Sequence, residues 1–195
     1  MKNNSNKLQG KDLINVGIFT AIYFVIVFAV AMLGYIPILM ALLCVLVPII
    51  GGIPFMLFLT KVKRFGMVLI MSIIIGSLML LTGMGYYALI VGTVSGLVAE
   101  LVLASGKYKS TTKAVLTSGI FSIWVWGNFV PFFTDIKGYF ATRQDYGQEY
   151  INKLTSYMTG WMCPTLLVAA FVSGIIGGFL GRAVLKKHFT KAGIA

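Results

Sequence analysis

Residues Asp12–Leu33 read DLINVGIFTAIYFVIVFAVAML, and this stretch decides the class of the fold. No charged side chain occurs between Leu13 and Leu33. A helix needs about 20 apolar residues to cross a hydrocarbon core about 30 Å thick. The stretch is also longer than the apolar region of a signal peptide, which holds about 7–15 residues. It therefore predicts a first transmembrane helix and not a cleaved leader.

The whole chain has the composition of an integral membrane protein. Of its 195 residues, 58% are hydrophobic and 11% are charged, and the mean hydropathy is +0.93. An average soluble domain carries about 25% charged residues, and a small chain buries only part of its surface. A bilayer removes that difficulty, because lipid-facing side chains already lie in an apolar solvent. The composition thus argues against a soluble enzyme.

Hydrophobic stretches separated by turns and charges predict an all-α bundle of six transmembrane helices. In a single membrane domain over residues 1–195, the expected spans are 12–33, 35–60, 66–81, 86–105, 114–133 and 157–180. Their lengths, about 16–26 residues, suit a bilayer once tilt is allowed. The second span contains Pro37, Pro48, Pro54 and the pair Gly51-Gly52, which predicts a kink or break. The polar segment 135–154 is expected to be an exposed outer loop.

The positive charges predict the orientation in the plasma membrane. The net charge is +11, and 13 of the 16 Lys and Arg residues fall in the two tails and in the loops after the second and fourth spans. The remaining three, Lys137, Arg143 and Lys153, share their loop with acidic residues. Cytoplasmic segments carry the excess of Lys and Arg, so both termini are expected to be cytoplasmic. No basic stretch is interleaved with stacking aromatics, which argues against nucleic-acid binding.

Two small residues lie on one face of the first span. Gly17 and Ala21 are four residues apart, and this spacing lets another helix approach closely. Five residues separate Gly17 from Asp12, which places the pair about 8 Å from the start of the span, near the cytoplasmic surface. The other helix belongs either to this protein's own bundle or to a partner.

Aromatic and polar residues gather near the expected outer surface. Asn128 lies about 22 Å along the fifth span from its inner end, and Trp124 shares its face. Apolar and aromatic walls with a few polar groups are typical of a small-molecule pocket. The alternative is an aromatic belt at the membrane interface. The candidate substrate-binding residues are Tyr35, Tyr86, Tyr87, Trp124, Asn128, Asp135 and Trp161.

Glu100 is the only acidic residue well inside a hydrophobic run. It lies about 9 Å from the inner end of the fourth span, within reach of the interface or of a lysine in a neighbouring loop. A proton or ion relay usually needs partner acids in other spans. The sequence shows none, so Glu100 does not predict ion coupling.

Catalytic and metal-binding patterns are missing from the sequence. There is no Ser-His-Asp set in the spans, no HExxH and no GxxxxGK[ST] motif, so neither an intramembrane enzyme nor a P-loop ATPase is expected. Cys44 and Cys163 lie inside apolar runs, and His188 is the single histidine. No metal site, disulfide or cofactor is expected from them.

Three stretches carry a resemblance to a known family. They are DLINVGIFTAIYF at 12–24, GIPFMLFLTKVKRFG at 52–66 and AELVLASGKYK at 99–109. The chain resembles the substrate-binding S components of energy-coupling factor (ECF) transporters, and more narrowly the Trep_Strep (MptD-like) family. The likeness covers nearly the whole chain. The second and third stretches are the more specific, and the first is general among S components.

The resemblance implies a transport function without catalysis. S components have six helices with both ends inside, and they bind a vitamin or similar micronutrient in a pocket open to the outside. An AxxxA-type face on their first helix contacts a membrane T protein that sits on two ABC ATPases. Gly17 and Ala21 match that face, with Gly in place of the first Ala. The substrate does not transfer with the fold, and a structural or regulatory membrane subunit that binds no solute is the alternative function.

Overall fold

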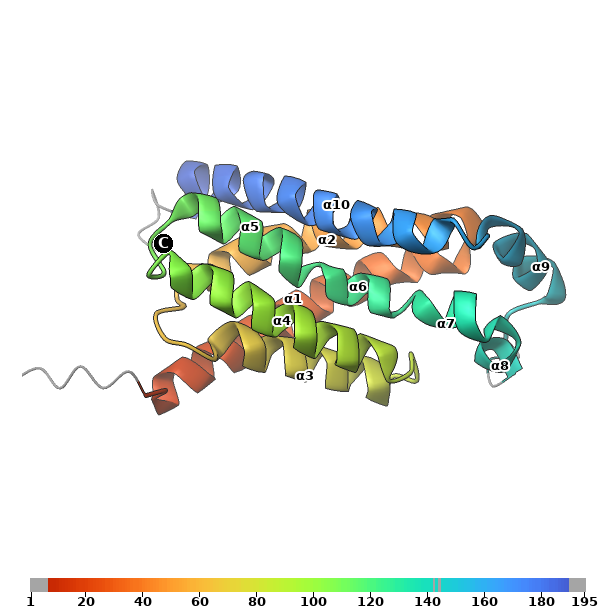
Figure 1. Cartoon of the computed structure of the whole chain (residues 1–195), viewed down its shortest axis with the longest axis horizontal. Coiled ribbons are helices and arrows are strands. Elements are labelled where there is room, and N and C mark those ends of the chain that lie inside the picture. The colour runs from red at the N-terminus through yellow and green to blue at the C-terminus, as the bar shows by residue number, and fades with distance from the viewer. Residues whose placement is uncertain (1–6, 142, 144, 190–195) are drawn as a thin grey trace, which may run out of the picture.

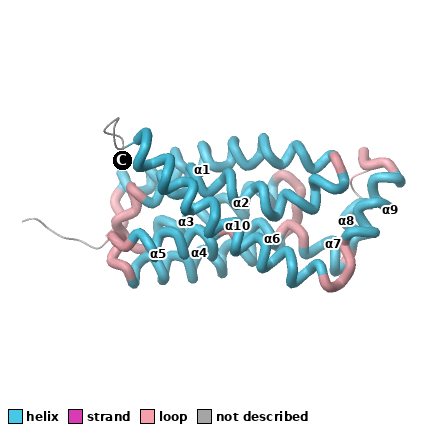
Figure 2. Tube along the Cα trace, turned by 90° about the horizontal axis from the view of Figure 1, so that it is seen from above, coloured by secondary structure: helices cyan, strands magenta, loops and turns pink. Residues whose placement is uncertain are grey.

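The protein forms a long bundle of helices in the computed structural model, which describes residues 7–141, 143 and 145–189 (Figure 1). The elements are α1 Gly10–Ala31, η1 Met32–Tyr35, α2 Pro37–Leu59, α3 Met67–Leu81, α4 Tyr87–Ser105, α5 Thr111–Phe121, α6 Ile123–Gly127, α7 Val130–Thr134, α8 Ile136–Ala141, α9 Gln148–Tyr157, α10 Met162–Val184 and η2 Leu185–Phe189. Figure 2 shows helices and loops but no strand over these described residues. The all-helical prediction is confirmed.

Four helical segments are long and apolar enough to cross a membrane. They are Gly10–Tyr35, Pro37–Leu59, Tyr87–Ser105 and Met162–Lys187. Helix α3 is apolar as well but has only 15 residues. Many large apolar side chains on these helices are exposed, among them Val25, Leu101 and Val168. Exposed apolar faces of this extent are expected where lipid replaces water around the bundle.

The second expected span forms one continuous helix, so of the kink or break expected from its prolines the break is absent. Helix α2 continues through Pro48 and Pro54 as one element of 23 residues. Proline removes one backbone donor from a helix, but neighbouring helices can hold the chain in place where it is buried. Pro48 and Pro54 are both buried, and α2 packs extensively against α1 and α10. This tertiary packing overrides the local breaking signal.

The interruption lies instead in the fifth expected span, which is divided into α5, α6 and α7. Ser122 Oγ donates to the carbonyl of Ser118, a bond of the kind that bends helices. Pro131 supplies no N–H at the start of α7, and the N–H groups of Asn128 and Phe129 bond three residues back, to Val125 and Trp126. The helix is therefore interrupted twice, at Ser122 and between Gly127 and Val130.

The expected outer loop, residues 135–154, is largely helical. It contains α8 and most of α9, whose Leu154 is fully buried. Helix α9 packs against α2. The polar composition of the segment reflects the exposed faces of two short helices and not an irregular loop. The last long helix, α10, begins only at Met162, after α9 has ended at Tyr157.

Glycines let α10 approach two neighbours closely. Gly177 and Gly181 face α2, where a Cβ on Gly52 would lie 2.6 Å from Cα of Gly177. On a neighbouring face of α10, Gly174 and Gly178 contact Ser118 and Ser122 of the α5–α6 segment. Small residues four apart permit such close packing where the hydrophobic effect is absent. These contacts tie the fifth and second spans to the last.

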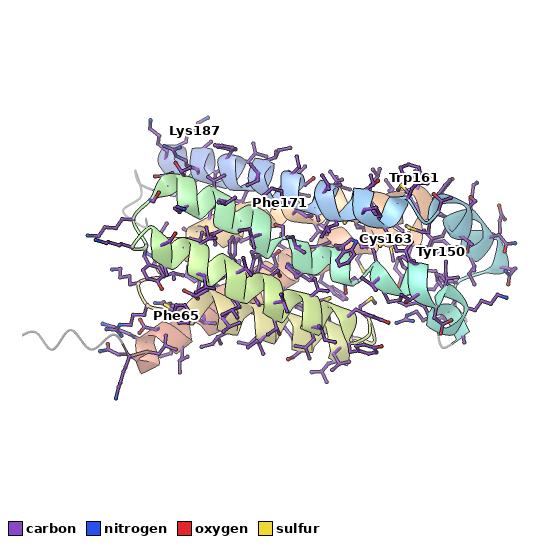
Figure 3. The ribbon with its side chains drawn as sticks, viewed as in Figure 1. Phe65, Tyr150, Trp161, Cys163, Phe171 and Lys187 are labelled. Carbon is purple, nitrogen blue, oxygen red and sulfur yellow. The ribbon has the colours of Figure 1, made fainter. Side chains whose placement is uncertain are left out.

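The two ends of the bundle differ in character (Figures 1 and 3). At one end α1 begins, α10 ends and the α2–α3 and α4–α5 connections turn; we call it the basic end because it carries Lys61, Lys63, Arg64, Lys107, Lys109, Lys113, Arg182, Lys186 and Lys187. Asp12 and Arg64 form an ion pair of 2.5 Å there, joining α1 to the α2–α3 connection. The opposite end carries α8 and α9, and we call it the α8–α9 end.

Candidate binding cavity

A cavity of about 480 Å³ lies inside the bundle near the α8–α9 end. Its walls come from the second half of α1 with η1, the first half of α2, the end of α3, the α6–α7 region and the α8–α9 segment. Six of the lining residues are aromatic: Phe28, Tyr35, Trp124, Phe129, Tyr139 and Tyr146. Four more are methionines: Met32, Met40, Met79 and Met84. A volume of this size is typical of sites that hold a small organic molecule.

Trp124 forms a fixed wall of the cavity. Its side chain is buried, and its Nε1–H donates to the hydroxyl of Tyr23 over 3.1 Å. The two rings also meet edge to face, with centroids 6.3 Å apart. Tyr23 in turn packs edge to face against Phe121. Because the indole N–H is already satisfied, Trp124 offers a ligand its ring surface.

Asn128 offers the cavity a buried polar atom. Its Nδ2 donates to the carbonyl of Val125 over 3.3 Å, at the bend between α6 and α7. Its Oδ1 is buried and has no hydrogen-bond partner among the described residues. An unpaired buried acceptor costs about 1–3 kcal/mol. A ligand that donates an N–H or O–H to Asn128 would recover that free energy.

The remaining lining favours a neutral ligand with flat apolar faces. No charged side chain lines the cavity within the described part of the chain. The methionine side chains are flexible and polarisable, and thioethers make favourable contacts with aromatic rings. An ionised ligand group would lose its hydration here without finding an opposite charge.

The α8–α9 segment covers one side of the cavity and is fastened at two points. Tyr150 donates its hydroxyl to the carbonyl of Gly34, at the α1–α2 connection, over 2.5 Å. Arg143 donates to the carbonyl of Gly83, at the α3–α4 connection, and its guanidinium lies 3.6 Å from the ring centre of Tyr139. Tyr35 stacks on Tyr146 at 5.9 Å. The segment therefore bridges two connections across the cavity.

These covering residues were missed by the sequence analysis. The polar composition of residues 135–154 drew attention away from their aromatic side chains, Tyr139, Phe140, Tyr146 and Tyr150. In the structure the four rings pack together, with centroids 4.7–6.3 Å apart between contacting pairs. The spacing of aromatics in an otherwise polar segment was the available signal.

The structure brings together three of the seven candidate substrate-binding residues. Tyr35, Trp124 and Asn128 line the cavity, whereas Tyr86, Tyr87, Asp135 and Trp161 do not. Asp135 is exposed, and its Oδ1 accepts from the N–H of Gly138 over 2.9 Å at the start of α8. Its carboxylate therefore caps the start of α8 and does not line the cavity.

The three aromatic residues outside the cavity lie on the surface. Tyr86 and Tyr87 stack on each other with centroids 4.5 Å apart, and Tyr86 is exposed. Trp161 is 67% exposed at the start of α10 (Figure 3). Aromatic side chains in such positions fit the belt at a membrane interface better than a pocket.

Gly17 and Ala21 lie on the exposed face of α1. The buried face of this helix is formed by Asp12, Val16, Thr20, Tyr23 and Val27. A Cβ placed on Gly17 would meet no atom within 4 Å. The pair therefore does not serve packing within this bundle, which was one of the two alternatives.

Within the described part of the chain, no three His, Cys, Asp or Glu side chains gather as a possible metal site. Cys44 is buried, where its Sγ donates to the carbonyl of Leu166, and Cys163 is half-buried. The ion pair of Asp12 and Arg64 lies at the basic end, away from the cavity. The cavity can therefore bind a ligand through complementary shape and through one hydrogen-bond acceptor, Asn128 Oδ1.

Comparison with known proteins gives a family. The sequence profile of Trep_Strep, described as a hypothetical bacterial integral membrane protein, matches residues 10–191. Searches of curated proteins and of solved structures each found no match. The matched range includes every described helix that could cross a membrane. The resemblance inferred from the three sequence stretches is thus confirmed, and the chain belongs to the Trep_Strep family of bacterial integral membrane proteins.

Proposed function

We propose that this membrane protein is the substrate-binding S component of an ECF-type transporter that imports a vitamin or similar micronutrient. The observation that carries the proposal is the cavity of about 480 Å³ with the unpartnered Oδ1 of Asn128 on its wall. A purely structural subunit has no need of an internal cavity of this size. The absence of catalytic motifs in the sequence accords with a subunit that binds but does not react.

The proposal includes six spans with both termini in the cytoplasm. The α5–α7 segment, although bent, would serve as the fifth span, and the short apolar helix α3 as the third. The basic end would then face the cytoplasm, as the distribution of Lys and Arg predicts. The cavity would lie toward the outer surface, beneath the α8–α9 segment. An outward site of this kind suits capture of a scarce solute.

The proposed partners are a membrane T protein and two ABC ATPases. Support comes from the exposed face of α1, where Gly17 and Ala21 would allow a partner helix to approach closely. In the hydrophobic stretch of this helix only 22% of the residues are buried within the bundle. Hydrolysis of ATP by the partners would drive release of the solute inward.

The side chains that line the cavity restrict the class of solute that it would bind. The solute would be neutral, with a flat aromatic or heteroaromatic portion to lie against Trp124 and the methionines. One N–H or O–H group would meet Asn128 Oδ1.

Co-purification from native-like membranes tests the partner half of the proposal. Tagged protein is expected to capture a T protein and two ATPases, and the double variant Gly17→Leu/Ala21→Leu is expected to lose them. Ala29→Leu is the matched control, because Ala29 is equally exposed on α1 but lies toward the other end. Loss of capture by both variants, or by neither, contradicts the proposed interface.

Ligand binding tests the other half. Thermal unfolding in detergent is measured with a panel of vitamins, divided into neutral heteroaromatic and ionised compounds. A neutral compound is expected to raise the unfolding temperature, because a ligand that binds only the folded state stabilises it. A well-folded protein that responds to no compound, and captures no partner, would favour the structural-subunit alternative.

A further inference from the structure

A second cavity, of about 330 Å³, lies at the basic end of the bundle, away from the cavity described above. It is formed where α2 and α10 end and where α4 connects to α5. Figure 1 shows these three places gathered at one end of the molecule. Since all of them are helix ends, the cavity lies at the level where a bundle leaves the hydrocarbon and meets lipid headgroups.

Three cationic side chains line this cavity. They are Lys109 from the α4–α5 connection, Arg182 from the last turn of α10 and Lys186 just beyond it. None of them forms an ion pair among the described residues. Among the described residues no carboxylate lines the cavity, and the nearby Glu100 is buried and already accepts from Tyr108 and the N–H groups of α3. The three positive charges are therefore available to an anion.

Backbone donors add to the positive character. Helix α5 begins at this cavity, with Ser110 as its N-cap and Thr111 as its first residue, and both line the wall. The first N–H groups of a helix have no acceptor within the helix, and its N-terminus carries partial positive charge. Lys107 and Tyr108, just before it, both have left-handed backbone conformations (φ 51° and 58°). This tight turn brings Lys109 and the start of α5 to the same cavity.

The floor of the cavity is apolar. Met56, Leu59 and Leu103 are buried beneath it, and Ala114 and Leu185 contribute at its sides. A free inorganic anion would gain nothing from such a floor. An amphiphile would place its charged group against the cations and its hydrocarbon along the apolar residues.

We propose that this cavity binds the headgroup of an anionic phospholipid, with its phosphate held by Lys109, Arg182 and Lys186. Arg182 can hold two phosphate oxygens at once through its planar guanidinium, and the two lysines add charge. The apolar part of the lipid next to the headgroup contacts Met56 and Leu59 on the cavity floor, and the acyl chains continue from there into the bilayer. The site fastens the end of α10 to the α4–α5 connection through a shared lipid. This inference does not depend on the proposed transport function.

The test measures retention of phosphatidylglycerol against phosphatidylcholine by native mass spectrometry of the full chain in mixed micelles. The pocket variant is Lys109→Gln/Arg182→Gln/Lys186→Gln. The control variant is Lys7→Gln/Lys11→Gln/Lys63→Gln, which removes the same charge from exposed positions at the same end, on and near α1. Because the pocket variant removes the charged donors that would contact the phosphate directly, it is expected to weaken phosphatidylglycerol binding by at least about tenfold.

The control variant is expected to keep nearly all of the preference for phosphatidylglycerol. Equal loss in both variants would overturn the site, because it would reflect general attraction to the basic end. Binding of sn-glycerol 3-phosphate as tight as that of the lipid would overturn the lipid assignment in favour of a soluble phosphate. If the pocket variant retains phosphatidylglycerol but loses captured T protein or ATPases, the cavity docks an acidic protein segment instead. The single variant Arg182→Gln serves if the triple variant fails to fold.

Discussion

Glu100 on α4 accepts a hydrogen bond of 2.7 Å from the backbone N–H of Val68, in the first turn of α3. Its Oε2 also accepts from the N–H of Leu69, and its Oε1 accepts from the hydroxyl of Tyr108. The residue is completely buried. A helix leaves its first four N–H groups unsatisfied, and carboxylates near that end are favourable. The acid in an apolar run is thus a cap supplied to α3 by a neighbouring helix.

This arrangement predicts that Glu100→Leu destabilises the protein. Two buried N–H groups of α3 lose their acceptor, each at a cost of about 1–3 kcal/mol. Glu100→Gln keeps an acceptor oxygen and is expected to cost less. Burial and the carboxylate of Glu100 both raise the pKa of Tyr108, so its hydroxyl stays protonated as the donor at neutral pH. The unfolding temperatures of both variants are measured in detergent, and the lipid-facing change Leu101→Ala is the control. An unfolding temperature of Glu100→Leu equal to that of the wild type would refute the capping role.

Two glycines of the same chain are predicted to respond in opposite ways to the same substitution. A Cβ on Gly177 would lie 2.9 Å from the carbonyl oxygen of Ile49, so Gly177→Ala forces α2 and α10 apart. Overpacking of this kind costs about 1–3 kcal/mol. A Cβ on Gly17 meets nothing within 4 Å, so Gly17→Ala is expected to gain about 0.5–1 kcal/mol from better helix propensity. The unfolding temperature, measured in the same detergent, is expected to fall for Gly177→Ala and to rise for Gly17→Ala. Equal shifts would mean that the close contact of α2 and α10 does not exist in solution.

The long apolar helices could be predicted because their hydrophobic runs are visible in the sequence. The limits of α3 and α4, at Met67 and Tyr87, lie one residue from the expected starts. A kink or break was expected in the second span, yet α2 is continuous through Pro48, whereas the fifth expected span is interrupted. Burial alone does not separate the two cases, since Pro48 and Pro131 are both buried; Pro48 lies inside a helix packed against α1 and α10, and Pro131 lies at the start of α7. Tertiary packing of this kind is not visible in a local pattern.

The cavity was predictable only in part. Trp124 and Asn128 share a helix face, and that spacing is local enough to read from the sequence. The role of Glu100 depends on the backbone of α3, which the sequence does not place, whereas Asp135 accepts from Gly138, three residues further on, in a local cap. The glycines of α10 were not considered, although Gly174, Gly177, Gly178 and Gly181 form two stripes at helical spacing. Glu100 and these glycines were missed because their roles depend on contact across helices.

Asn128 is predicted to anchor the ligand of the larger cavity. Asn128→Leu keeps the size of the side chain but removes the buried Oδ1, so a neutral ligand that donates to it loses about 1–3 kcal/mol of binding free energy, roughly tenfold or more in affinity. Trp126→Phe is the control, since Trp126 donates to Cys163 and does not line the cavity. The shift of the unfolding temperature on addition of ligand is measured for both variants. An unchanged shift in Asn128→Leu, with a lost shift in Trp126→Phe, would place the ligand elsewhere.

The hydroxyl of Tyr150 is predicted to hold α9 against the α1–α2 connection. Tyr150→Phe keeps the ring in its aromatic cluster but removes the donor to the carbonyl of Gly34. Backbone amides of Gln148–Tyr157 are therefore expected to exchange with deuterium faster, because local opening becomes less costly. Tyr157→Phe is the matched control, since Tyr157 lies in the same helix and has no hydrogen bond from its hydroxyl among the described residues.

The pKa of Tyr150 determines how the hydrogen bond to Gly34 depends on pH. Burial raises the pKa of the Tyr150 phenol above its usual value of 10.0, and the neighbouring Tyr146 and Tyr139 act in the same direction. A group whose pKa is raised on folding contributes its full stabilisation below the unfolded pKa and loses it as the pH rises through the folded pKa. The contribution of Tyr150 is therefore constant from neutral pH up to about 10 and falls only in stronger alkali. After correction for the intrinsic pH dependence of exchange, protection of α9 in the wild type should not change between pH 6 and about 9. A loss of protection within that range, absent from Tyr150→Phe, would show that the hydroxyl ionises early and that the contact is weaker than its burial implies.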